Sequence, residues 1–220
     1  PYYLSVVAQA NLVHFGESKI LFLDMGSHSV VRGTSTAPLY TDITRLFTQA
    51  LPESSQTLFL GGGAYVMPSD LARTPGTSVT VYELDPEVPS IAKQYFSPDP
   101  RINTRIGDAR VLLRRDAHQY DLIVGDSFQS FLSIPWHLLT KEFHDEIAEH
   151  LTPKGVYAVN IVSAVEGDKS ILFRSVVRTL QETFQYLTAY HFGGDAKTQQ
   201  NIMILASRQS LDEWIELGKD

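Results

Sequence analysis

The sequence predicts an α/β protein built around a mainly parallel β-sheet with helices on both faces. From residue 57 onward, short apolar runs alternate with helical patterns, which is the order that βαβ units produce. The first of these runs leads directly into three consecutive glycines, as strands do at the ligand-binding edge of open α/β sheets. The composition, with 43% hydrophobic and 20% charged residues over 220 positions, is that of a globular chain able to bury a sizeable core.

The N-terminal part has a different pattern from the rest of the chain. Residues 1–36 contain short apolar runs separated by Gly, Asn and Ser turns, which predict a small β-hairpin unit. Pro38 opens the next segment, in which apolar residues recur at helical spacing up to Pro52. We therefore expect an N-terminal β-hairpin unit over residues 1–36 and a larger α/β domain over residues 37–220.

The predicted strands of the main sheet follow in order along the chain. We expect parallel strands at residues 57–60, 78–82, 102–106, 121–124 and 155–161. Two later runs, at residues 185–190 and 201–206, lie on either side of a Gly193-Gly194 turn and are expected to close the sheet as an antiparallel pair. No internal repeat, low-complexity tract or long linker interrupts this order.

Charge and residue usage exclude several classes of protein. The net charge of -7 lacks the basic footprint that binds a phosphate backbone, so no nucleic-acid partner is expected. The absence of cysteine excludes thiolate metal ligands, and the histidines apart from His137 are scattered without metal-ligand spacing, so no metal is expected. Because no apolar run approaches the roughly 20 residues that span a bilayer, we expect a cytoplasmic location, with a membrane tether only in a longer parent chain.

The three glycines and a later glutamate predict a nucleoside site. Gly61, Gly62 and Gly63 follow a buried strand and precede a helical pattern, so the backbone there can approach a ligand closely. Glu83 ends the next strand, about 20 residues later, where an acidic side chain accepts hydrogen bonds from ribose hydroxyls. The glycines alone are also compatible with a tight turn that binds nothing, but the pair favours a nucleoside held between the loop and Glu83.

Two further aspartates follow predicted strands. Asp85 precedes Pro86 and Glu87 and is interpreted as the cap of the helix that begins there. Asp108 comes after the third strand, on the same edge of the sheet as the glycines. Two interpretations of Asp108 stay open: a helix N-cap, or a contact with an exocyclic amine such as that of adenine.

The fourth strand ends at Asp126, again on the edge that carries the glycines. Residues 128–137 are too irregular for a helix and too apolar for a plain solvated loop, which predicts a segment that covers the substrate. His137 ends this segment and is therefore a candidate functional residue. The nearby cluster of Arg110, Arg114 and Arg115 is interpreted as a solvated helix face.

Four motifs carry a resemblance: Leu60-Gly-Gly-Gly63, Tyr82-Glu-Leu-Asp85, Gly107-Asp-Ala-Arg110 and Tyr120-Asp-Leu-Ile-Val-Gly-Asp126. Together they resemble the polyamine aminopropyltransferase family, the spermidine synthases and their relatives. The likeness covers nearly the whole chain and includes residues 40–42, which are similar to the family's Tyr-x-acidic element. Through residues 125–128 and 134–143, the chain most resembles spermidine synthase-like domains that are fused to membrane transporter-like segments.

The resemblance implies a class I S-adenosylmethionine methyltransferase-like Rossmann fold with a small N-terminal β unit. It implies a co-substrate, S-adenosylmethionine or its decarboxylated form, that is bound by Gly61, Gly62, Gly63, Glu83, Asp108 and Ala109. Asp126 would be the base beside the attacking amine, and Tyr40 would position that amine, with Gln129 and His137 on the substrate side. The expected partners are a small-molecule amine acceptor, a second copy in a homodimer and an attached membrane segment outside this chain.

The chain departs from the family pattern at two positions. Ala64 stands where the family carries an acidic residue that binds the amino group of the aminopropyl chain. Gln129 or a neighbour replaces a second acidic residue, which engages the acceptor amine. Each lost carboxylate forfeits a charge-assisted hydrogen bond worth about 1.5–3 kcal/mol.

These departures leave three hypotheses. The leading one is an aminopropyltransferase-like enzyme that uses Asp126 as its base. The second is a methyltransferase that uses intact S-adenosylmethionine, which Ala64 favours, and the third is a non-catalytic domain that senses the nucleoside for an attached membrane partner. An NAD-dependent dehydrogenase is disfavoured because the loop lacks the dinucleotide spacing of glycines.

Overall fold

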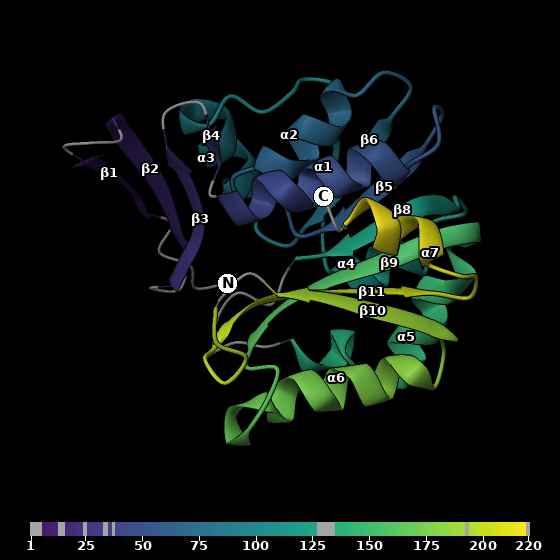
Figure 1. The fold of residues 1–220 in the computed structure, drawn as a ribbon. Coiled ribbons are helices and arrows are strands. Elements are labelled where there is room, and N and C mark those ends of the chain that lie inside the picture. The colour runs from purple at the N-terminus through teal and green to yellow at the C-terminus, as the bar shows by residue number, and fades with distance from the viewer. Residues whose placement is uncertain are drawn as a thin grey trace.

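The computed structural model describes residues 6–12, 16–23, 26–32, 35–36, 38–126, 135–191 and 194–218. Within these ranges the chain forms a four-stranded sheet and a seven-stranded sheet that is covered by helices (Figure 1). None of the helices in these ranges combines the length and the apolar character needed to cross a membrane.

The small sheet is an antiparallel meander with the order β1-β2-β3-β4. Its strands are β1 (Val6–Leu12), β2 (Gly16–Leu23), β3 (Gly26–Arg32) and β4 (Ser35–Thr36). The short strands that the sequence predicts are thus present. The division into units at residues 36 and 37 stays a prediction.

The large sheet has the order β10-β11-β9-β8-β5-β6-β7. Its strands are β5 (Gln56–Leu60), β6 (Ser78–Glu83), β7 (Asn103–Ile106), β8 (Tyr120–Gly125), β9 (Leu151–Ser163), β10 (Tyr186–His191) and β11 (Gln200–Ser207). Strands β9, β8, β5, β6 and β7 are parallel neighbours, as predicted. The last two strands form the expected antiparallel pair, and β11 inserts between β10 and β9.

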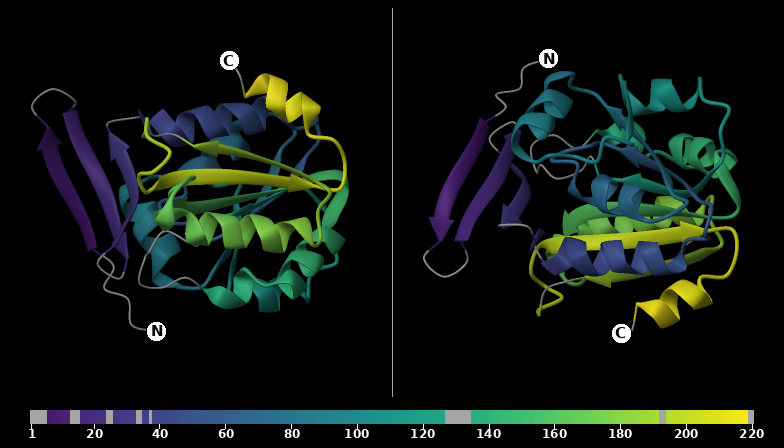
Figure 2. Two further views of the ribbon diagram at one scale, coloured as in Figure 1. Left: turned by 60° about the horizontal axis from the view of Figure 1, so that its bottom comes forward. Right: turned by 90° about the horizontal axis from the view of Figure 1, so that it is seen from above.

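Helices cover both faces of the large sheet (Figure 2). One face packs against α1 (Pro38–Ala50), α2 (Val66–Arg73), α3 (Glu87–Tyr95) and α7 (Asp212–Leu217). The other packs against α4 (Ala109–Leu113), α5 (Lys141–Glu149) and α6 (Ile171–Gln181). Two short 3-10 turns, η1 (Trp136–Leu138) and η2 (Asp168–Ser170), precede α5 and α6.

Successive side chains of each strand point to opposite faces of the sheet, so the core has two layers. The same alternation determines which side chains lie on each face at the carboxyl edge. On β8, Leu122 and Val124 face the α1 layer, whereas Ile123 faces the α5 layer. On β9, Val156 and Ala158 share the α1 layer in the same way. Where the parallel pairing of β8 and β9 ends, the next residue in each row is polar, Asp126 after Val124 and Asn160 after Ala158. The small sheet lies beyond this edge of the large sheet (Figures 1 and 2).

A buried histidine in the α5 layer makes stability depend on pH. His144 is fully buried, and its ring centre lies 6.0 Å from that of Tyr157. Burial lowers the pKa of His144 to about 4, below the ordinary histidine value near 6.5. The unfolded chain therefore binds a proton more readily than the folded chain between these two values.

Lowering the pH from 8 to 4 is expected to cost roughly 3 kcal/mol of unfolding free energy through His144. This contribution to stability is fully present above the pKa of His144 in the unfolded chain, and it is lost as the pH falls through the pKa of His144 in the folded chain. Urea unfolding of the wild type and of His144→Leu at several pH values measures this loss. The variant should lose less stability than the wild type, and equal losses in both would contradict the assignment.

Candidate functional site

The glycine loop between β5 and α2 adopts a conformation that only glycine takes easily. Gly61 has φ 100° and Gly63 has φ 50°, both in the region that disfavours residues with a Cβ. The Gly61 amide donates a hydrogen bond of 2.8 Å to the Tyr82 carbonyl, which joins the loop to the end of β6. The loop is thus fixed at the carboxyl edge of two adjacent strands.

Gly62 is required for a different reason. The buried ring of Tyr65 packs directly on it, and a Cβ at this position would overlap that ring. The Tyr65 hydroxyl in turn accepts a hydrogen bond of 3.3 Å from the Thr104 hydroxyl on β7. Tyr65 therefore packs beneath the loop and connects it to β7.

Gly62→Ala is expected to lower the unfolding free energy by about 1–3 kcal/mol, because the added methyl group overpacks against Tyr65. Urea unfolding measures the change. Gly194→Ala is the matched control, since a Cβ there meets no atom within 4 Å, and it should stay within about 0.5 kcal/mol of the wild type. Equal effects of the two substitutions would contradict the close contact between Gly62 and Tyr65.

Glu83 ends β6 with its carboxylate turned back to the glycine loop. Its Oε2 accepts a hydrogen bond of 2.8 Å from the Gly62 amide, and its Oε1 accepts one of 3.1 Å from the Asp85 amide. The residue is only 8% exposed. Burial raises the pKa of Glu83, and the backbone amides that donate to it oppose this effect. A buried carboxylate held in this way can accept hydrogen bonds from a ligand's hydroxyl groups.

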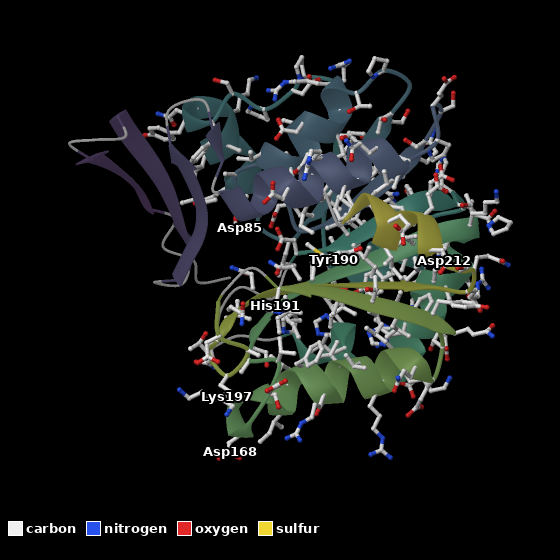
Figure 3. The ribbon with its side chains drawn as sticks, viewed as in Figure 1. Asp85, Asp168, Tyr190, His191, Lys197 and Asp212 are labelled. Atoms are coloured by element: carbon white, nitrogen blue, oxygen red, sulfur yellow. The ribbon has the colours of Figure 1, made fainter. Side chains whose placement is uncertain are left out.

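Asp85 lies just before the N-cap of α3, which is Pro86. Its Oδ1 accepts a hydrogen bond of 2.8 Å from the amide of Glu87, the first residue of α3. Figure 3 places Asp85 on the side of the large sheet that faces the small one, together with His191 at the end of β10. The hydrogen bond from the Glu87 amide agrees with the interpretation that the Asp85 side chain caps this helix.

Asp108 forms the helix N-cap that is one of its two predicted roles, while the other role, a contact with an exocyclic amine, stays a prediction. It is the N-cap of α4, and its Oδ1 accepts a hydrogen bond of 3.0 Å from the Val111 amide. Its Oδ2 lies 3.1 Å from Nε2 of His137. The cap is thus formed, while the second oxygen faces a half-exposed histidine at the end of the segment that the sequence predicts to cover the substrate. Ala109 begins α4 next to it.

An arginine network fixes His137 in place. Nη1 of Arg110 donates a hydrogen bond of 3.1 Å to the His137 carbonyl. Nη2 of Arg110 forms an ion pair of 2.7 Å with the Glu146 carboxylate on α5, and Arg114 binds the same carboxylate. The side chain of Arg110 is only 17% exposed. The interpretation of this arginine cluster as a solvated face is therefore wrong for Arg110, because α5 supplies a carboxylate that its sequence position does not reveal.

Asp126 follows β8 directly. Its amide donates a hydrogen bond of 3.2 Å to the Leu60 carbonyl, so it lies beside the start of the glycine loop. Its Oδ1 accepts a hydrogen bond of 2.9 Å from Nδ2 of Asn160 on β9. Sequence reasoning missed Asn160. The available signal was a lone amide within the apolar run of residues 155–161.

Most of the predicted site residues share one edge of the sheet. Glu83 ends β6, while the glycine loop, Asp108 and Asp126 follow β5, β7 and β8. These four strands are adjacent in the order β8-β5-β6-β7. Tyr40 lies in the first turn of α1, and Gln129 falls outside the described residues. Within the described ranges, no group of three or more His, Asp or Glu residues could hold a metal ion.

The fold and this edge define a class I methyltransferase-like Rossmann domain. The family model for the spermine/spermidine synthase domain matches residues 39–193, and the chain belongs to this family. It is 37% identical over 133 residues to a polyamine aminopropyltransferase from Vibrio vulnificus, and this match covers 57% of this chain and 44% of that protein. It is also 30% identical over 129 residues to a spermidine synthase from Solanum lycopersicum, over 55% of this chain and 37% of that protein. The matches span less than half the length of these relatives.

Solved structures share the fold at low sequence identity. A probable spermidine synthase from Corynebacterium glutamicum has a TM-score of 0.78 at 21% identity, over 96% of this chain and 80% of that one. Human methyltransferase-like protein 13, in complex with SAH, has a TM-score of 0.67 at 19% identity, over 83% of this chain and 90% of that one. The methyltransferase-like Rossmann fold that the sequence predicts is confirmed.

Proposed function

We propose that this chain is a spermidine synthase-like transferase that moves an aminopropyl group from decarboxylated S-adenosylmethionine to a small-molecule amine. The observation that carries the proposal is the pair of carboxylates on the edge of the sheet. Glu83 is fixed against the glycine loop, and Asp126 is fixed beside the start of the same loop. Relatives named polyamine aminopropyltransferase and spermidine synthase support this choice of reaction.

The nucleoside half of the site would use Glu83 and Asp108. Glu83 would accept hydrogen bonds from the ribose hydroxyls while it keeps its backbone donors. Asp108 would accept from the exocyclic amine of adenine through the oxygen that faces His137. Gly61, Gly62, Gly63 and Ala109 would let the backbone lie close to the ligand.

The transfer half would use Asp126. An amine acceptor enters as an ammonium ion, and Asp126 attracts it and accepts its proton, so that nitrogen has a lone pair. The nitrogen then attacks the carbon next to the sulfonium sulfur, a C–N bond forms, and the C–S bond breaks with its electron pair going to sulfur. Methylthioadenosine leaves as a neutral thioether, and the two protons that remain on nitrogen stay with the product, a secondary ammonium ion. Tyr40, Gln129 and His137 would contact the acceptor or the transferred chain.

One specific observation favours a second candidate, a methyltransferase that uses intact S-adenosylmethionine. Ala64 is buried in the glycine loop, where a carboxylate would otherwise bind the lone amino group of the decarboxylated form. The fold itself is shared with a methyltransferase-like protein. The loss of acidic residues at Ala64 and at Gln129 or a neighbour is also compatible with a non-catalytic domain that senses the nucleoside.

Calorimetric titration tests the proposed co-substrate. The protein is titrated with decarboxylated S-adenosylmethionine, intact S-adenosylmethionine and methylthioadenosine. Tighter binding of the decarboxylated form supports aminopropyl transfer despite Ala64. Tighter binding of the intact form would overturn it in favour of the methyltransferase or the sensor.

The proposal extends to the setting of the domain. The stretch at residues 134–143 resembles that of spermidine synthase-like domains fused to membrane transporter-like segments. In such a parent chain the domain would face the cytoplasm and pair with a second copy. Measuring the mass of the purified domain in solution tests the dimer.

A further inference from the structure

Strand β9 carries a buried amide, which the core does not need, where its parallel pairing with β8 ends. Asn160 is 3% exposed and follows Val156 and Ala158 on the α1 side of the sheet. Burying an amide among apolar neighbours costs free energy unless it is hydrogen bonded. An aliphatic residue would fill this position at lower cost, so the amide needs another explanation.

Strand register supplies that explanation. Gly125 of β8 pairs with Val159 of β9, so the next residues along the two parallel strands, Asp126 and Asn160, are also neighbours. The rows of side chains on the α1 face therefore change from apolar to polar at the same level on both strands. Nδ2 of Asn160 donates to Oδ1 of Asp126 over 2.9 Å.

We infer that Asn160 is a positioning residue for Asp126: it fixes the carboxylate on the side of the acceptor and favours its charged form. An amide N–H that points at a carboxylate stabilises the anion, which attracts an ammonium ion. The inference rests on the proposed function of Asp126. The neighbouring strands present the Leu60 carbonyl from β5 and the Asn160 amide from β9, and Glu83 and Asp108 are the next carboxylates along this edge.

The first test is Asn160→Leu, which keeps the approximate shape and removes the donor. With decarboxylated S-adenosylmethionine and putrescine as probes, kcat should fall about 10-fold to 100-fold, while KM for the nucleoside should change little. The acid limb of kcat/KM against pH should move up by about one pH unit, because the anion loses a donor. Asn160→Asp should move that limb further, since two adjacent carboxylates share a proton.

Ser163→Ala is the matched control on the same strand. Ser163 is also fully buried, but its hydroxyl donates to the Lys169 carbonyl and accepts from the Phe173 amide, away from Asp126. It should lower stability without moving the pH profile. If Asn160→Leu behaves like this control while Asp126→Asn is inactive, Asn160 is a structural residue and the inference fails.

A measurement without turnover separates this inference from the proposed function. The carboxyl carbon of Asp126 is followed by 13C NMR in the wild type and in Asn160→Leu, and its signal is assigned by its loss in Asp126→Asn. A titration midpoint at higher pH in Asn160→Leu supports the inference even if putrescine is not a substrate. Identical midpoints would overturn it, whatever reaction the protein performs.

Discussion

Asp126→Asn is expected to lower aminopropyl transfer by about 10²-fold to 10⁴-fold, which is the range that a lost general base produces. Asparagine fills the same space at the end of β8, but it can neither attract the ammonium ion of the acceptor nor accept its proton. Nucleoside affinity should be unchanged, because Glu83 and the glycine loop do not depend on this carboxylate. Steady-state turnover and calorimetric titration with methylthioadenosine measure the two effects separately.

Asp121→Asn is the control for this substitution. Asp121 lies at the opposite end of the same strand, where it accepts hydrogen bonds from the Gln56 amide and the Thr152 hydroxyl. Its replacement should leave kcat within a few-fold of the wild type. If Asp126→Asn keeps full turnover, Asp126 is not the base and the acceptor must be deprotonated elsewhere.

Glu83→Ala is expected to weaken methylthioadenosine binding by about 10-fold to 100-fold, since charge-assisted hydrogen bonds of about 1.5–3 kcal/mol to the ribose are lost. It also leaves the amides of Gly62 and Asp85 without their carboxylate acceptor. Calorimetric titration of the variant measures the affinity. Exposed Glu87 on the first turn of α3 is the control, and Glu87→Ala should bind as the wild type does.

The same carboxylate predicts a pH dependence of binding. Burial raises the pKa of Glu83, so it becomes protonated at a higher pH than an ordinary glutamate, whose value is about 4.3. As the pH is lowered, affinity for methylthioadenosine should therefore begin to fall at a pH above the ordinary pKa of glutamate. A wild-type affinity that is flat to pH 4 would show that Glu83 does not hold the ligand as an anion.

Much of the fold follows from local sequence. Apolar runs of four to seven residues predict the strands because each must be buried on the sheet, and β5, β6 and β8 begin and end within about a residue or two of the predicted positions. Strand β9 is longer than predicted, Leu151–Ser163 against 155–161. At its start it includes Pro153 and Lys154, which are exposed and interrupt the apolar pattern. Insertion of β11 between β10 and β9 depends on long-range pairing, which no local pattern encodes.

The candidate site divides in the same way. The carboxyl ends of parallel strands meet at one edge, so acidic residues after the strands could be placed together from the sequence. The contacts of Asp108 with His137, of Arg110 with Glu146 and of Asp126 with Asn160 join residues 29 to 36 positions apart. They depend on how η1, α5 and β9 pack, so they emerge only from the structure. The roles of these side chains in the reaction stay predictions.

Product analysis tests the central claim most directly. The protein is incubated with decarboxylated S-adenosylmethionine and putrescine, and in parallel with intact S-adenosylmethionine and the same amine, and the nucleoside products are separated and quantified. Aminopropyl transfer predicts methylthioadenosine in a one-to-one ratio with the lengthened amine, from the decarboxylated form alone. S-adenosylhomocysteine from the intact form, or saturable binding without any product across a panel of cellular amines, would contradict the claim and identify a methyltransferase or a sensor instead.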